Sequence, residues 1–146
     1  MSRHALPLVA LLLAMPGAAR AECTQCTCTL EASALNFGPY DARLPQTTSV
    51  ADVRVTCEGD NGYVLKLGSG QSGTPLQRRM RSGTSALDYN LFKDPGRSLI
   101  WGDGSAGQTG VNGTGSGTYS VYGAIPGGQT PLVGTYNDQL VLTIEY

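Results

Sequence analysis

Three closely spaced cysteines near the start of the chain are the residues best suited to do chemistry. Cys23 and Cys26 form a CxxC motif, and Cys28 follows two residues later. A redox-active CxxC sits near a βαβ pattern, whereas three thiolates at this spacing would suit a soft metal ion. No βαβ pattern surrounds the motif. We therefore favour structural disulfides and keep a redox or metal protein as a competing hypothesis, which counting the free thiols would decide.

The chain has four cysteines, the fourth being Cys57. An even number of cysteines in an exported chain indicates disulfides, and four cysteines allow three pairings. Cys26 with Cys28 is an awkward pair, because alternate residues of an extended segment lie ~6.6 Å apart and a bridge needs side chains that face each other. The pairing that we favour is Cys28–Cys57 together with Cys23–Cys26.

Residues for acid–base catalysis are scarce. His4 is the only histidine, and it lies in an N-terminal segment that we expect to be removed. Its loss excludes Ser-His-Asp and Cys-His arrangements and takes away the commonest transition-metal ligand. Asp103, in Trp101-Gly102-Asp103-Gly104, is interpreted as a turn residue whose carboxylate accepts local hydrogen bonds. We therefore expect no enzyme, no cofactor and no metal site.

The charge pattern gives no support for a nucleic-acid partner. The formal net charge is −1, and the one basic cluster is Arg78-Arg79-Met80-Arg81. A cluster this short is interpreted as a solvated strand or turn.

Residues 1–21 have the order of a secretory signal peptide. Arg3 and His4 form a basic start, Leu6–Met15 is apolar apart from one proline, and Ala19-Arg20-Ala21 is a small-residue cleavage motif. The apolar stretch is shorter than the roughly 20 residues that span a membrane. We predict a single secreted domain over residues 22–146, with no membrane span.

The elements that must position these residues are strands. Short runs with period-two alternation are separated by glycine and proline turns, which predicts an all-β sandwich of seven or eight strands. Gly102–Gly117 is rich in glycine and predicts a loop or weak hairpin. The expected strands cover residues 28–33 with a continuation at 35–37, 50–57, 63–67, 76–81, 87–92, 119–125 and 139–146.

The last of these strands runs to the final residue. It places Leu140, Leu142, Ile144 and Tyr146 on one face, which we expect to point toward the core. An unpaired strand edge is a template for pairing with another chain. The pattern alone leaves two interpretations open, a strand paired within a complete sandwich and a strand beside an open groove.

Several segments, taken in order, resemble one known family. They include the terminal Gly134-Thr135-Tyr136 and Thr143-Ile144-Glu145-Tyr146, and before them Leu35-Asn36-Phe37-Gly38-Pro39-Tyr40-Asp41, Val53-Arg54-Val55-Thr56-Cys57, Tyr63-Val64-Leu65-Lys66-Leu67, Leu87-Asp88-Tyr89-Asn90-Leu91 and Val121-Tyr122-Gly123-Ala124-Ile125-Pro126-Gly127-Gly128. The chain resembles the spore coat protein U domain family, which includes pilin subunits of archaic, Csu-like chaperone–usher pili. The resemblance covers nearly all of the chain after residue 21.

The resemblance implies an incomplete immunoglobulin-like β-sandwich with an open groove for a donor strand. A periplasmic chaperone would fill the groove first, and a neighbouring subunit would replace it at the usher. Leu140, Leu142, Ile144 and Tyr146 would then flank the groove, and Cys28 and Cys57 match the family's usual disulfide positions.

One feature departs from the family pattern, because residues 22–27 contain no large apolar side chain. This chain is therefore expected to receive a donor strand more readily than to give one. The sequence predicts a non-enzymatic structural or accessory subunit of a surface pilus, exported through the periplasm to the cell surface. The alternative is a stand-alone secreted adhesion module that presents Gly102–Gly117 to a ligand.

Overall fold

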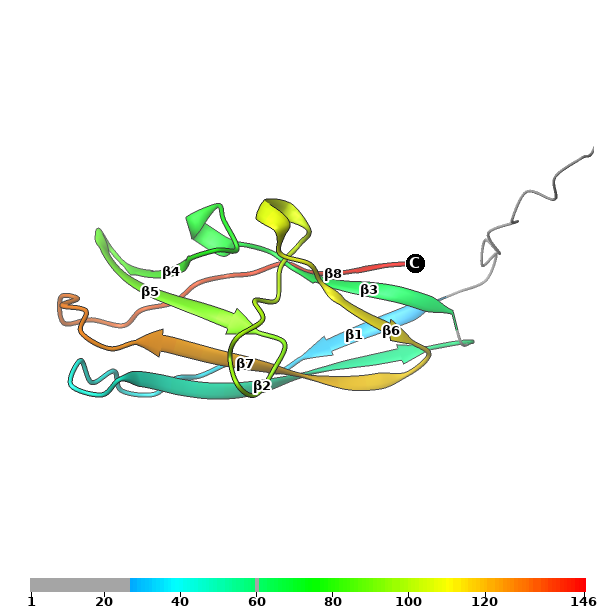
Figure 1. Cartoon of the computed structure of the whole chain (residues 1–146), viewed down its shortest axis with the longest axis horizontal. Coiled ribbons are helices and arrows are strands. Elements are labelled where there is room, and N and C mark those ends of the chain that lie inside the picture. The colour runs from blue at the N-terminus through cyan, green and yellow to red at the C-terminus, as the bar shows by residue number, and fades with distance from the viewer. Residues whose placement is uncertain (1–26, 60) are drawn as a thin grey trace, which may run out of the picture.

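The computed structural model describes residues 27–59 and 61–146. In this part of the chain, strands form two sheets (Figure 1). Two short 3₁₀ turns lie in loops that connect strands. The five-stranded sheet has the order β1 (Cys28–Ala32), β2 (Gln46–Cys57), β7 (Gly117–Pro126), β5 (Ser85–Phe92) and β4 (Arg78–Ser82). The three-stranded sheet has the order β6 (Val111–Thr114), β3 (Gly62–Leu67) and β8 (Leu142–Glu145). The 3₁₀ turns are η1 (Gly70–Ser72) and η2 (Ser105–Gly107).

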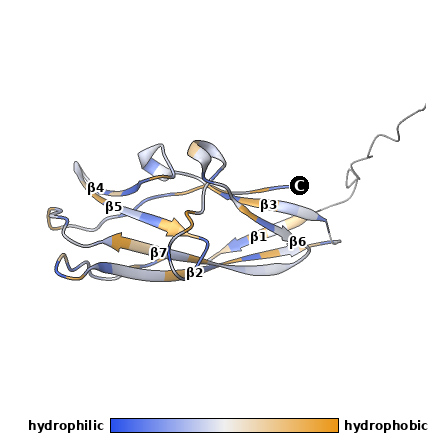
Figure 2. Cartoon of the chain, in the orientation of Figure 1, coloured by the Kyte–Doolittle hydropathy of each residue, from blue (hydrophilic) through white to orange (hydrophobic). Residues whose placement is uncertain are grey.

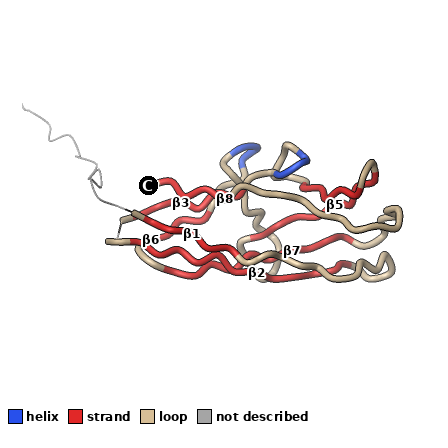
Figure 3. The backbone as a smooth tube through the Cα atoms, turned by 180° about the vertical axis from the view of Figure 1, so that it is seen from behind, coloured by secondary structure: helices blue, strands red, loops and turns tan. Residues whose placement is uncertain are grey.

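The alternation along β2 shows why the sequence folds this way. Ala51, Val53 and Val55 are buried, while Asp52 and Arg54 between them are exposed. Successive side chains of a strand point to opposite faces, so an alternating strand buries one face and solvates the other. Figure 2 shows apolar segments along the strands, and Figure 3 shows how these strands alternate with loops along the chain. The all-β sandwich predicted from the sequence is confirmed.

The core lies between the two sheets. Trp101 and Leu65 are fully buried, and the indole Nε1 of Trp101 donates to the Leu65 carbonyl at 2.9 Å. This bond satisfies the polar atom of a buried indole, as buried tryptophans usually require. Within the described residues, no helix is long and apolar enough to cross a membrane.

The glycine-rich stretch differs from its prediction. Residues 111–114 form β6, which pairs with β3, so the stretch is partly sheet. Gly113 faces the rings of Tyr63 and Tyr119, and a Cβ atom at Gly113 would collide with both. Here glycine allows the backbone to approach two aromatic side chains closely. From the sequence pattern alone, such a glycine cannot be distinguished from a glycine in a loop.

The basic cluster also differs from its prediction. It forms an edge strand, β4, but Arg78 is fully buried. Its guanidinium donates to the carbonyl oxygens of Leu67, Gly68 and Trp101 and to Oδ1 of Asn90, at 2.7–2.9 Å. Burial holds the pKa of Arg78 below its ordinary value. The interpretation as a solvated cluster is therefore wrong for Arg78, because carbonyls from distant segments converge on it.

Most strand boundaries differ by a few residues from the sequence pattern, and the largest differences are in β2, in β8 and after β1. β2 begins at Gln46 rather than at residue 50, and β8 covers only residues 142–145 of the predicted 139–146. Residues 35–37, predicted to continue the first strand, lie beyond the end of β1. There the backbone is held by side chains: the Ser49 hydroxyl donates to the Asn36 carbonyl at 2.6 Å.

Candidate functional site

Each of the two sheets ends in two edge strands, and β1 and β8 are one edge strand from each sheet. Within the described residues, β1 pairs only with β2, and β8 pairs only with β3. Each is therefore an edge strand of its sheet, with one row of backbone N–H and C=O groups that no other described strand uses. Such a row can pair with an added strand.

A groove continues from these edges along the chain segments that extend β1 and precede β8. We call residues 34–40 the N-terminal lip and residues 134–140 the C-terminal lip. Two hollows, of about 500 Å³ and 250 Å³, lie between the lips. They form one groove, since both are lined by the same five residues: Ala34, Leu35, Phe37, Met80 and Tyr136.

The floor of the groove is made by residues of the hydrophobic core. Met80 from β4, Leu87 and Leu91 from β5, and Ile125 from β7 line it and are buried. Leu35, Phe37, Tyr136 and Leu140 on the lips are only partly buried and pack against the same cluster. Within the described residues, the groove is therefore bordered by apolar side chains that the sandwich buries only in part.

The N-terminal lip is held by aromatic packing and by side-chain hydrogen bonds. The Phe37 ring meets the Tyr89 ring edge-on at 5.9 Å, and it lies so close to Gly123 of β7 that a Cβ atom there would come within 2.7 Å of it. The Tyr40 hydroxyl donates to the Pro126 carbonyl at 3.1 Å and accepts from the Gln129 N–H at 3.0 Å.

Three of the four residues predicted to flank the groove contact the core. Leu140, Leu142 and Ile144 are half-buried against it, and of these Leu140 lines the smaller hollow. Tyr146 lies beyond the end of β8 and is 61% exposed. Sequence reasoning missed Tyr136, although it continues the same period-two row, and it missed Met80 and Leu87, which come from a hairpin remote in sequence.

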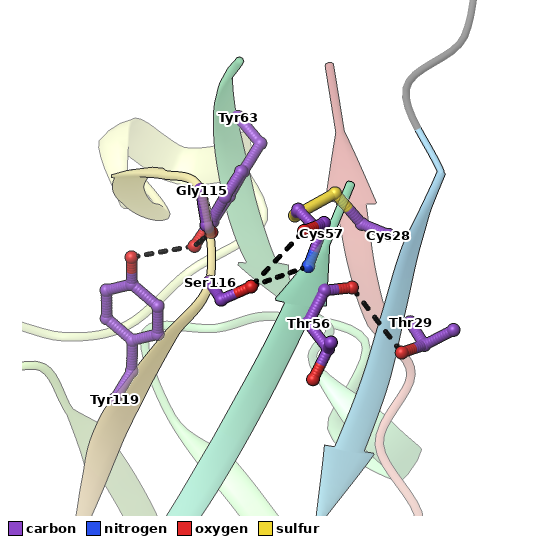
Figure 4. Close-up of a disulfide and its surroundings, with 8 residues drawn as sticks. All are labelled: Cys28, Thr29, Thr56, Cys57, Tyr63, Gly115, Ser116 and Tyr119. Carbon is purple, nitrogen blue, oxygen red and sulfur yellow. Dashed lines mark hydrogen bonds between the residues drawn. A yellow bond between two sulfur atoms is a disulfide. The ribbon is translucent and has the colours of Figure 1, made fainter. Parts of the chain in front are cut away.

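A disulfide fixes the open edge strand β1. Cys28 and Cys57 are bonded, and they are also direct partners in the β1–β2 register, with Cα atoms 4.1 Å apart (Figure 4). The hydroxyl of Ser116 accepts from the Cys57 N–H at 2.9 Å. Cys23 and Cys26 lie outside the described residues, so their predicted bond stays a prediction.

The remaining sequence-predicted positions show no catalytic arrangement. The Asp103 carboxylate accepts hydrogen bonds from the N–H and hydroxyl of Ser105, and these bonds hold its pKa below the ordinary range. This is the turn geometry expected of Asp103. Among the described residues, no group of three His, Cys, Asp or Glu side chains is placed to hold a metal ion.

The chain is similar to a known protein in sequence, to a solved structure in fold, and to the model of one protein family. The chain is 35% identical over 130 residues to "Protein U" of Myxococcus xanthus, an alignment that covers 77% of this chain and 71% of that protein. Its fold is similar to a chain in the crystal structure of the chaperone–tip adhesion subunit pre-assembly complex of archaic chaperone–usher Csu pili from Acinetobacter baumannii. The TM-score is 0.57 at 24% identity, and the match covers 84% of this chain but only 40% of that one. The model of the Spore Coat Protein U domain matches residues 18–143. The chain therefore belongs to the Spore Coat Protein U domain family.

Proposed function

We propose that this protein is a structural or accessory subunit of a surface pilus, assembled by chaperone–usher donor-strand exchange. The observation that carries the proposal is the apolar groove between two lips, flanked by the free edges of β1 and β8. An added strand would complete the sandwich there.

Physical chemistry supports this use of the groove. An extended segment that enters it gains main-chain hydrogen bonds from an open edge, and its alternate side chains fill the hollows. Each apolar Å² removed from water contributes about 25 cal/mol. The half-buried residues of both lips and the hollows between them supply that apolar surface. The same surface, left open, would favour aggregation, which is a physical reason for a chaperone to accompany the subunit.

The partners follow from this mechanism. A periplasmic chaperone would fill the groove first, and an usher and neighbouring subunits would follow. The similarity of fold to a chain in a chaperone–subunit pre-assembly complex supports a chaperone as one of these partners. On this proposal the protein passes through the periplasm, is non-enzymatic and acts at the cell surface.

The test is an immunoblot of a sheared surface fraction, run in SDS with and without boiling. Strand-exchanged polymer gives a ladder of high-mass bands that collapses to monomer on boiling. The variant Leu140→Asp places a charge in the groove and should abolish the ladder. Val141→Asp is the matched control, because Val141 is the next residue and is 71% exposed. A monomer band alone in the unboiled wild type would refute assembly by strand exchange.

A second candidate function, attachment by a stand-alone secreted module, is favoured by the loop between β7 and β8. Leu132 and Val133 in this loop are 69% and 107% exposed, and the loop lies at the end of the molecule opposite the C-terminus (Figure 1). Its backbone is fixed, because the Leu132 N–H donates to the Ser85 hydroxyl and the Leu132 carbonyl accepts from the Tyr136 hydroxyl. Loss of adhesion in a Leu132→Ser, Val133→Ser variant that is secreted and unfolds in urea like the wild type would assign attachment to this loop.

A further inference from the structure

One polar residue interrupts the inward-facing row of the C-terminal segment. Positions 136, 138, 140, 142 and 144 are all partly buried, while the positions between them are exposed. Four of the five are apolar, and the fifth is Asp138, which lines the smaller hollow of the groove. A carboxylate in an apolar row is costly to bury unless hydrogen bonds satisfy it, so its partners indicate what it does.

The backbone of the C-terminal lip is weakly tied to the rest of the sandwich near Asp138. Asn137 exchanges two backbone hydrogen bonds with Arg81, at 2.9 and 3.1 Å. The next backbone bond along the segment runs from the Gly68 N–H to the Val141 carbonyl, at 2.9 Å. Between these two points, the described structure has no strand ladder that holds the lip.

The side chain of Asp138 bridges this interval. Its Oδ2 accepts from the Tyr89 hydroxyl at 2.8 Å, and its Oδ1 accepts from the Gln71 N–H at 2.9 Å. Gln71 also donates from its side chain to the Asn137 carbonyl at 3.0 Å. Gly70, with φ +61°, lies so close to the carboxylate that a Cβ atom would collide with it. The lip is thus joined to β5 and η1 through one carboxylate.

We propose that Asp138, with Tyr89 and Gln71, pre-organises the groove by holding the C-terminal lip in position while no donor strand is present. These are positioning residues, and the proposal rests on the proposed function of the groove. Burial raises the pKa of the Tyr89 hydroxyl well above its ordinary value. The hydroxyl therefore stays protonated, and remains a donor to Asp138, throughout the neutral range.

The physical reason is entropic. A lip that moves freely must be ordered when a strand binds, and the ordering free energy is subtracted from the affinity. A lip already fixed by hydrogen bonds avoids that loss. The neighbouring aromatic contact acts in the same direction, because the Tyr89 ring also packs edge-on against Phe37 of the opposite lip. Tyr89 therefore contacts both sides of the groove from its floor.

The test uses Tyr89→Phe, which removes one oxygen and leaves the ring that lines the groove. Tyr63→Phe is the matched control, because Tyr63 is equally buried and its hydroxyl is also hydrogen-bonded, to the Gly115 carbonyl and the Tyr119 hydroxyl, away from the groove. The probe is a synthetic peptide of about ten residues that alternates isoleucine with threonine. A peptide of the same composition with its isoleucines grouped is the reference for non-specific binding.

The affinity of Tyr89→Phe for the alternating peptide should fall about fivefold, the factor for one lost hydrogen bond, while Tyr63→Phe binds like the wild type. Hydrogen exchange at the amides of Gln139 and Leu140 should be faster in peptide-free Tyr89→Phe and equal to the wild type once peptide is bound. Asp138→Asn should behave as Tyr89→Phe does. If the wild type prefers the alternating peptide but Tyr89→Phe binds it equally well with unchanged exchange, pre-organisation is refuted. If the wild type shows no preference for the alternating peptide, the proposed function fails, and the inference fails with it.

Discussion

Replacing Arg78 with methionine should destabilise the protein strongly, because Arg78 joins segments that are far apart in sequence. Its guanidinium donates to carbonyls at the end of β3, at residues 67 and 68, and to the carbonyl of Trp101, and it also bonds Asn90 on β5. Methionine can replace the aliphatic stem of arginine, but it is shorter and has no hydrogen-bond donor. Three backbone carbonyls and one amide oxygen therefore lose this partner within the core.

The magnitude follows from these four bonds. A hydrogen bond to a charged group contributes about 1.5–3 kcal/mol, so four such bonds sum to at least about 6 kcal/mol. Removing a buried charge returns part of its desolvation penalty, which amounts to several kcal/mol. We expect a net loss of about 3 kcal/mol in the free energy of unfolding. That is a large fraction of the roughly 5–15 kcal/mol by which domains are stable.

The assay is urea unfolding followed by the fluorescence of Trp101, the only tryptophan of the chain. The probe is well placed, because Trp101 is fully buried and its own carbonyl accepts from Arg78. Arg81→Met is the matched control, since Arg81 lies on the same strand with a half-exposed side chain and should change stability by less than about 0.5 kcal/mol. An Arg78→Met variant within 1 kcal/mol of the control, roughly the contribution of a single hydrogen bond, would refute the reasoning.

Three further predictions concern the end of the sandwich near the disulfide. Gly113→Ala should lower the free energy of unfolding, measured by urea titration, by about 1–3 kcal/mol, because the added Cβ atom would overpack against Tyr63 and Tyr119. Unchanged stability would show that the two rings can move aside. Replacing Cys28 and Cys57 with alanine, which opens a loop of sequence separation 29, should cost about 3–4 kcal/mol by the same measurement. Burial raises the pKa of Tyr63 to about 12, so the unfolded chain ionises first and stability should fall as the pH rises from about 10 toward 12. Tyr63→Phe should make that decline smaller, with the rest coming from Tyr89, whose pKa is also raised by burial, and an equal decline in the variant would assign it to groups other than Tyr63.

The strands could be predicted because their signal is local. β2 shows it well: Val53 and Val55 alternate with Asp52 and Arg54, and the buried and exposed faces can be assigned from neighbouring letters alone. The pairing of Cys28 with Cys57 could also be predicted, since four cysteines allow only three pairings and the one that joins Cys26 to Cys28 is geometrically awkward.

Arg78 could not be assigned in the same way. Arginine is usually exposed, and three basic residues within four positions indicate a solvated segment. What buries Arg78 is the convergence of carbonyls from residues 67, 68 and 101, which no local pattern encodes. The floor of the groove is similar, because Met80 and Leu87 become groove residues only where a hairpin packs beneath the two lips.

The groove itself explains why its lips are held by side chains. A strand normally holds its neighbours through a backbone ladder, but a ladder across this gap would close the site. Each lip is fixed largely by side chains: the N-terminal lip by Ser49 and Tyr40, the C-terminal lip by Tyr89 and Gln71 acting on Asp138. The C-terminal lip has in addition one backbone bridge, between Asn137 and Arg81. On the proposed function, an incoming strand would pair with the edges of β1 and β8 that no other described strand uses. Asp138 would then be a polar side chain in an otherwise apolar row that keeps such an edge ordered while it stays open.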